Sequence, residues 1–253
     1  MNDLHRYLDN RKLLGVFVAA VILIGVLGMV VIFDDTPTTY HYEERLSSGE
    51  TRSTRFTIAG VHDANITVSF VDEPGLWYRV DMTHYTSVKH HSVNAVRKPS
   101  FLPLRVHLNS VTPVKTINIV LGTDVTHNLY ISGERLNTIV KVDNGAKISG
   151  SRCRFHSTGE FKFILKENVN FTSKGMDLLI GDGFLLPEPP ERVVLDINLP
   201  PGMNGRLSAQ NVSVYQNEWP IKQDDQYGTN SIDEPLLDIK IFYSLRVWVK
   251  LRI

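Results

Sequence analysis

Hydrophobic residues follow two different patterns along the chain. Residues 13–33 form an unbroken run of 21 residues without a charged side chain, whereas after about residue 51 apolar and polar side chains alternate. A helix rises about 1.5 Å per residue and the hydrocarbon core of a bilayer is about 30 Å thick, so ~20 apolar residues span it. The pattern predicts a mainly β protein, in which one N-terminal transmembrane helix precedes an all-β domain.

The charges beside the apolar run predict its orientation. Arg11 and Lys12 stand directly before it, and Asp34 and Asp35 follow it. Because Lys and Arg next to a membrane span tend to stay in the cytoplasm, we expect a single-pass protein of the cell membrane with its N-terminus inside. The expected segments are a cytoplasmic tail at 1–12, the helix at 13–33, a stalk at 34–50 and an extracytoplasmic β domain at 51–253.

A cleaved signal peptide is the alternative interpretation of this run. The apolar region of a signal peptide is about 7–15 residues long and ends at a site of small residues. Here the run is longer and ends in the bulky residues 29–33. We therefore favour an uncleaved anchor.

The clearest strand pattern lies at the C-terminal end. From Ile239 onward every odd-numbered residue is apolar or aromatic, and basic residues occupy several even positions. Side chains alternate between the two faces of a strand, so one face belongs to the core. We expect one strand that continues to the last residue. Phe242 and Trp248 fall on its polar face and are candidates for an exposed contact patch.

Apolar pairs recur at intervals of roughly ten residues between 115 and 183, with turn-forming glycines between them. Short strands at even spacing are typical of a β-solenoid, with an antiparallel β-sandwich as the alternative. The segment INIVLGTDVTHNLYISGERLNTIVKVDNGAKISG, with the later VVLDINLPPGMNGRLSAQNVSV, resembles the membrane-anchored putative-adhesin domains of bacteria and archaea. The resemblance covers about residues 115–215. It implies a β-helix fold and a surface location, and it brings no catalytic residues.

Composition narrows the range of partners. Without the first 12 residues, which hold three bases and two acids, the chain retains 24 basic and 25 acidic side chains. A nucleic-acid binder normally has a strongly basic surface, so we expect no nucleic-acid partner. The chain has a single cysteine, Cys153, so no intramolecular disulfide can form. In a strand Cys153 shares a face with Phe155, which favours a small apolar core residue.

Histidines and acidic residues supply the candidates for metal binding. His84, His90 and His91 lie near Asp81, a residue set that can bind zinc or copper. However, adjacent residues of a strand point to opposite faces, so we favour an exposed polar segment. The sequence GDG at 181–183 lacks the spaced carboxylates of a calcium loop and indicates a tight turn. Asp224, Asp225, Asp233 and Glu234 are interpreted as solvated loop charges. We expect no metal site and no cofactor.

Three Asn-x-Ser/Thr sequons are candidate glycosylation sites if the domain lies outside: Asn65, Asn170 and Asn211. The chain contains no G-x-S-x-G, P-loop, H-E-x-x-H or dinucleotide-binding motif, and we assign no catalytic residues. We therefore expect a non-enzymatic interaction or scaffold protein, adhesin-like or a subunit of an envelope complex, whose partner is a protein or an envelope polymer. The alternatives are a hydrolase of envelope polymers and an accessory or sensor module of a membrane complex.

Overall fold

The structure is a computed structural model. It describes residues 37–46, 53–85, 92–96, 104–109, 113–143, 145–166, 168–172, 175–181, 190–199, 202–209, 213–242 and 246–252. Within these ranges all regular secondary structure is β-strand, as the alternation of apolar and polar residues predicts. None of the described residues forms a helix that could cross a membrane. The apolar run at 13–33 lies outside the described residues.

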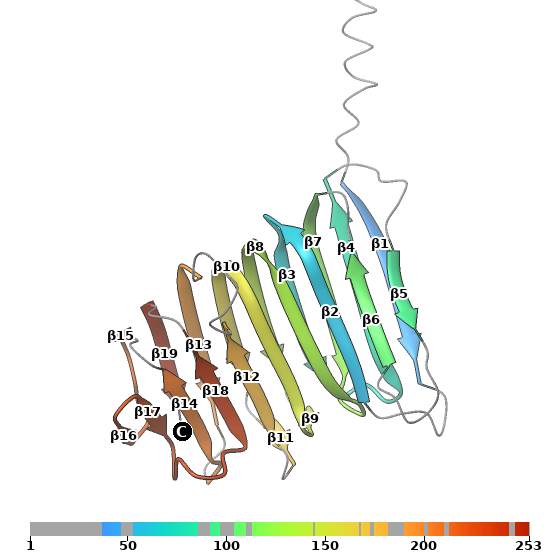
Figure 1. The fold of residues 1–253 in the computed structure, drawn as a ribbon. Helices are drawn as coiled ribbons and strands as arrows, with labels where there is room; N and C mark the ends of the chain where they lie inside the picture. Colours follow the sequence, from blue (N-terminus) through green and yellow to red (C-terminus); the bar gives the residue numbers. More distant parts are fainter. Residues whose placement is uncertain are drawn as a thin grey trace, which may run out of the picture.

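Most strands belong to one large, mixed and mostly parallel sheet (Figure 1). Two long strands, β8 (Thr126–Val142) and β10 (Ser151–Leu165), run parallel at its centre. The first part of β8 pairs with β2 (Ser53–His62), and its second part pairs with β3 (Asn65–Val71). The sheet therefore has two sides, named here the β2 side and the β3 side, which are continuous through β8 and β10.

Each side is a row of neighbouring strands that includes one part of β8 and of β10. On the β2 side, the strands before β8 are, in spatial order, β5 (Ser92–Val96), β6 (Leu104–Asn109) and β2. The strands after β10 on this side are, in spatial order, β12 (Met176–Ile180), β18 (Leu237–Ile241), β14 (Gly205–Ala209), β17 (Gln226–Gly228) and β16 (Ile221–Gln223). The β3 side contains β1 (Thr38–Arg45), β4 (Leu76–His84), β7 (Val114–Gly122) and β3 before β8, and β13 (Arg192–Asn198), β19 (Arg246–Arg252) and β15 (Ser213–Val214) after β10. A separate small sheet pairs β9 (Lys147–Ile148) with β11 (Asn170–Phe171).

The spatial order of the strands departs from chain order at both ends of the sheet. The consecutive strands β2 and β3 lie between β6–β7 and β8. Likewise, β18 and β19 lie between β12–β13 and β14–β15. Antiparallel pairs occur only toward the ends of the rows, among the described pairings. The central pairs are all parallel, so the antiparallel sandwich is not the arrangement of the described residues.

The passage of β10 from one side to the other depends on a glycine. The register of β10 against β8 shifts between Ser157 and Gly159. Gly159 has φ +101°, and a Cβ placed on it would lie 2.4 Å from the carbonyl oxygen of Leu136. A side chain there would be both strained and in collision with backbone, so the bend requires glycine.

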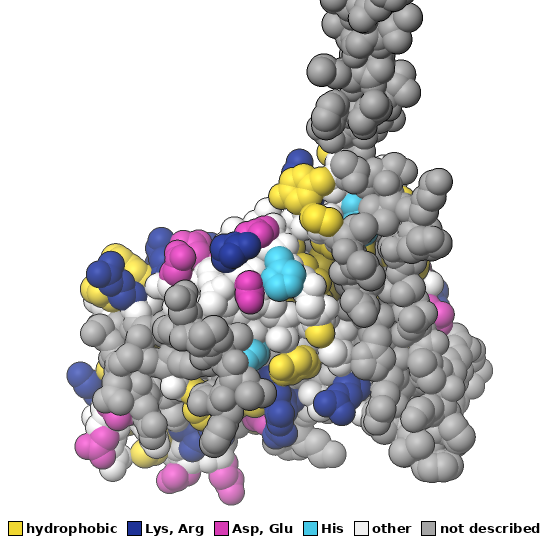
Figure 2. Space-filling view, turned by 45° about the horizontal axis from the view of Figure 1, so that its top comes forward, with side chains coloured by type: hydrophobic (Ala, Val, Ile, Leu, Met, Phe, Trp, Pro, Cys, Tyr) yellow, Lys and Arg dark blue, Asp and Glu magenta, His cyan; other side chains and the backbone are white. Residues whose placement is uncertain are grey.

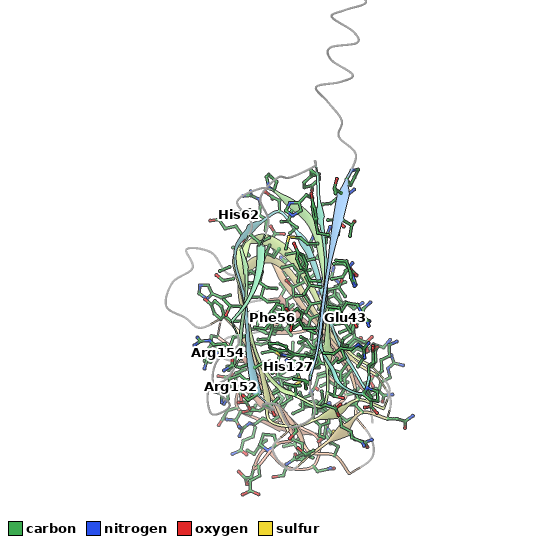
Figure 3. The ribbon with its side chains drawn as sticks, turned by 90° about the vertical axis from the view of Figure 1, so that its right-hand side faces the viewer. Glu43, Phe56, His62, His127, Arg152 and Arg154 are labelled. Carbon is green, nitrogen blue, oxygen red and sulfur yellow. The ribbon has the colours of Figure 1, made fainter. Side chains whose placement is uncertain are left out.

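The core lies between the two sides of the sheet (Figure 3). Phe56 of β2 meets Tyr78 of β4 edge to face at 5.7 Å between ring centroids, and Phe70 of β3 meets His127 of β8 at 6.0 Å. Each of these contacts joins one side of the sheet to the other. Alternate residues of the strands supply this core, which is why the sequence shows a period of two.

The structure differs from the sequence prediction in the bounds of two segments, the C-terminal strand and the stalk. The apolar alternation from Ile239 corresponds to two strands, β18 and β19, so the prediction of one continuous strand is wrong. The alternation continues because both strands face the same core, although they lie on different sides of the sheet. In addition, the segment expected as a stalk contains β1, which pairs antiparallel with β4.

Candidate interaction surface

Strand β19 presents a basic and aromatic row to solvent. Its odd-numbered residues Val247, Val249 and Leu251 are buried, so its even-numbered residues point outward. These outward residues are Arg246, Trp248, Lys250 and Arg252. Trp248 is 44% exposed, in agreement with its predicted place on the polar face.

Trp248 is held in place by side chains from both neighbouring strands. Tyr215, which directly follows β15, stacks on the indole with 4.9 Å between ring centroids and 13° between ring planes. The guanidinium carbon of Arg192, at the start of β13, lies 5.5 Å from the centre of the indole ring. Since β13 and β15 flank β19 on opposite sides, the three side chains form a stack across three strands. Stacking and cation–π contacts of this kind fix the ring orientation.

The charges around this stack are predominantly positive. Arg192 approaches Glu160 at 3.9 Å and Arg252 approaches Asp196 at 3.5 Å, and all four side chains are substantially exposed. Arg246 and Lys250 form no ion pair with any residue of the described part of the chain. We name Arg192, Tyr215, Arg246, Trp248 and Lys250 together the Trp248 patch.

Three basic residues of the β2 side, Arg152, Arg206 and Lys240, lie against acidic side chains. Arg152 donates to Asp177 at 2.9 and 2.7 Å from two of its nitrogens. Arg206 donates to both carboxylate oxygens of Asp238 at 3.0 and 2.8 Å, and Lys240 lies 3.0 Å from the same group. Burial acts to raise the pKa of Asp238, but these hydrogen bonds lower it overall.

The Trp248 patch lies at one end of the sheet. On the β3 side, β1 forms one end of the row and β15 the other, and Figure 1 shows them far apart. The space-filling view shows hydrophobic and basic side chains together at the β15–β19 end (Figure 2). The patch is thus remote from β1, the first described strand after the apolar run.

Phe242, the second predicted contact residue, is 47% exposed but has different neighbours. It follows β18 and borders a cavity of about 210 Å³, lined also by Tyr130, Arg154, Phe155, His156, Leu179 and Gly181. No described contact joins Phe242 to Trp248. The sequence therefore identifies two exposed aromatic residues, and the structure gives them separate surroundings.

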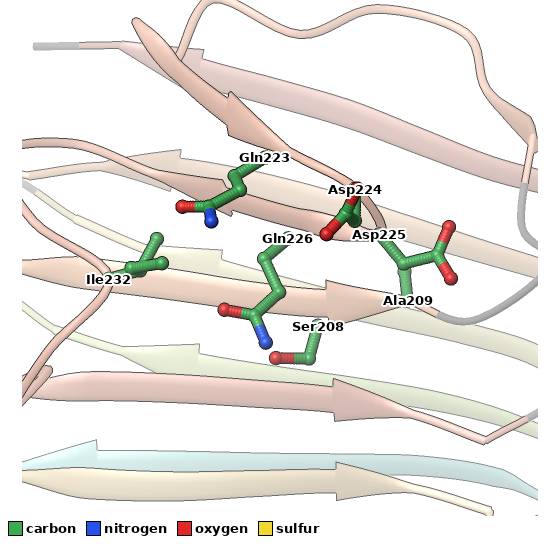
Figure 4. Close-up of a pocket in the computed structure, with 7 residues that line it drawn as sticks. All are labelled: Ser208, Ala209, Gln223, Asp224, Asp225, Gln226 and Ile232. Carbon is green, nitrogen blue, oxygen red and sulfur yellow. The ribbon is translucent and has the colours of Figure 1, made fainter.

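A polar hollow of about 330 Å³ lies at the β16–β17 hairpin (Figure 4). Ser208, Gln223, Gln226, Asp224 and Asp225 line it, with Ala209 and Ile232. Asp224 has φ +50° in the hairpin turn, and the backbone carbonyl of Asp225 accepts a hydrogen bond from the amide of Ala209 at 2.9 Å. Among the described residues, no group of three or more potential ligands is arranged to hold a metal ion.

Of the predicted histidine cluster, the structure describes His84 and Asp81, which lie on opposite faces of β4. His84 is buried, 3.1 Å from the sulfur of Met82, with its ring edge-to-face against Tyr40. Asp81 points outward and lies 2.6 Å from Nδ1 of His41. His90 and His91 fall outside the described residues, as do Asp182 and Gly183. Asp233 and Glu234 lie in an exposed loop between β17 and β18.

The remaining sequence candidates are placed as follows. Cys153 is fully buried, which confirms it as a core residue, and burial followed by the charge of Asp177 raises the pKa of its thiol. Asn65 is exposed at the start of β3, where its side-chain oxygen accepts a hydrogen bond from Asn137 at 3.1 Å. Asn170 is exposed in β11, and Asn211 lies outside the described residues.

Comparison with known proteins finds a likeness to a solved structure. No protein-family model matches the chain, and no curated protein matches it. Among solved structures, the chain is similar to a crystal structure of a putative cell adhesion protein from Clostridium sporogenes, with 8% sequence identity and a TM-score of 0.49. The match covers 85% of this chain and 100% of that chain.

Proposed function

We propose that this chain is a single-pass membrane protein whose β domain binds a component of the cell envelope without acting on it chemically. The apolar run at 13–33 and the basic residues before it support the anchor and an outward-facing domain. The parallel pairing of successive two-strand units supports a flattened β-solenoid as the domain fold. In this arrangement the domain is an adhesin-like interaction module.

The observation that carries the proposal is the Trp248 patch. Tyr215 is 52% exposed and Trp248 is 44% exposed, yet both are ordered by stacking and by Arg192. Exposed Trp, Tyr and Arg side chains are the types enriched at binding hot spots. Because the stack is already formed, a partner does not have to order these side chains, which lowers the entropic cost of binding. An anchor near the β1 end leaves this patch free to reach outward.

Binding to envelope material tests this proposal directly. The full chain in neutral detergent micelles is mixed with the insoluble envelope fraction of its source organism and sedimented. We expect the wild-type chain to co-sediment and Y215A/W248A to lose at least about tenfold in affinity, as removal of a binding hot spot does.

The matched control is Tyr85→Ala, which removes an exposed aromatic side chain next to β4, remote from the patch. We expect this variant to bind as the wild type does. Equal thermal unfolding temperatures of the three proteins show that folding is unchanged. Equal sedimentation of Y215A/W248A and wild type would contradict the proposed function of the patch.

A further inference from the structure

The chemistry of the Trp248 patch indicates which class of envelope component it binds, provided that the proposed function holds. Two features are available to a partner: an excess of positive charge, in which Arg246 and Lys250 form no ion pair within the described part of the chain although Asp196 lies beside Lys250, and an exposed aromatic surface next to these charges. They lie on adjacent strands of one outward surface, so one ligand can contact both.

The charges have a spacing that suits an extended polymer. Arg246 and Lys250 are four residues apart on the same face of β19. At about 3.3 Å per residue, their backbone positions are roughly 13 Å apart. This spacing suits a linear chain with repeated anionic groups, each of which can meet one of the two charges without the side chains having to converge. Trp248 lies midway between the two charges along the strand.

The aromatic part of the patch offers a platform on Tyr215. The indole of Trp248 is covered by Arg192 from the β13 side and by Tyr215 from the β15 side. No described strand pairs with β15 on its other edge, and Tyr215 remains 52% exposed. The flat, amphipathic ring of an exposed Tyr can pack against the C–H face of a sugar ring while its hydroxyl donates or accepts a hydrogen bond.

We propose that the Trp248 patch binds an acidic polysaccharide, with Arg246 and Lys250 pairing with its carboxylates and Tyr215, held in place by its stack on Trp248, contacting its sugar rings. Arginine can donate two parallel hydrogen bonds to a carboxylate, which gives selectivity for that group. Because the chain as a whole is nearly neutral, its net charge gives little general attraction for an anionic polymer. A polymer that lacks either the charge or the sugar ring would engage only half of these contacts.

Three soluble polymers separate these contributions, with the full chain in zwitterionic lipid nanodiscs. Alginate carries carboxylates on sugar rings, dextran has sugar rings without charge, and poly-L-glutamate has carboxylates without sugar rings. We expect alginate to bind most tightly and added salt to weaken it, because salt screens exposed charges. Equal binding of dextran would overturn the role of charge. Equal binding of poly-L-glutamate would overturn the role of the sugar.

Paired variants test the residues themselves. We expect R246Q/K250Q to bind alginate about five- to tenfold more weakly, the loss expected for two exposed charge contacts. The matched control is R55Q/K147Q, which removes two exposed positive charges from β2 and β9. Unchanged alginate binding by R246Q/K250Q, or no alginate binding by the wild type, would overturn the inference. If the wild type still binds the envelope fraction through Tyr215 and Trp248 in that case, the proposed function stands and only the ligand class is wrong.

Discussion

His127 is a buried imidazole whose two nitrogens both have partners. Nε2 lies 2.8 Å from the carbonyl oxygen of Gly122 and Nδ1 lies 2.8 Å from the hydroxyl of Thr54. Because a carbonyl only accepts, the neutral ring donates from Nε2, and its Nδ1 accepts from Thr54. Burial lowers the pKa of His127 from 6.5 to about 4, while the bond to Gly122 acts in the opposite direction.

This shift makes folding depend on pH. Between pH 6.5 and 4 the unfolded chain binds a proton at His127 that the folded chain does not bind, so stability falls as the pH falls. The full shift in pKa corresponds to a loss of about 3 kcal/mol in the free energy of unfolding once the pH has fallen below about 4. We expect urea-induced unfolding of the wild type to move to lower urea between pH 7 and pH 4.5. His127→Gln should be less stable at pH 7 and should show a smaller change with pH. An identical pH dependence in both proteins would contradict this role of His127.

At the scale of strands, the sequence predicts which residues face the core better than it predicts how strands pair. Val247, Val249 and Leu251 are buried as their alternation indicates, because the side-chain period of a strand is local. The insertion of β18 and β19 between β12–β13 and β14–β15 has no local signal. The same limit applies to the candidate surface. Trp248 could be predicted as exposed, but its contacts with Tyr215 and Arg192 depend on pairings between distant segments.

Strand β19 allows a matched test of its two faces. Leu251 is fully buried in the core, and its neighbour Lys250 points outward without an ion pair among the described residues. We expect Leu251→Ala to lower the free energy of unfolding by about 3 kcal/mol, because it removes buried methyl groups and leaves a cavity. Lys250→Ala should change it by less than about 0.5 kcal/mol. Equal effects on the urea midpoint would show that the assigned faces of β19 are wrong.

At the scale of the whole molecule, the positions of β1 and the Trp248 patch relate the proposed anchor to the proposed binding surface. β1 begins at Thr38, only a few residues after the apolar run ends at Phe33. The patch lies at the opposite end of the β3 side. A rigid domain held at the β1 end would keep the patch at the membrane surface at high local concentration, while directing it away from its own anchor. This arrangement requires the domain to be outside the cell.

The single cysteine gives a direct test of that requirement. Cys153 is fully buried and its thiol pKa is raised, so it should not react with a maleimide in the folded protein. Asp72 is exposed between β3 and β4, so Asp72→Cys provides one accessible thiol. We expect a membrane-impermeant maleimide to label Asp72→Cys in intact cells, and the wild type to remain unlabelled before and after lysis. Labelling of Asp72→Cys only after lysis would place the domain in the cytoplasm, where the Trp248 patch could not reach an envelope polymer.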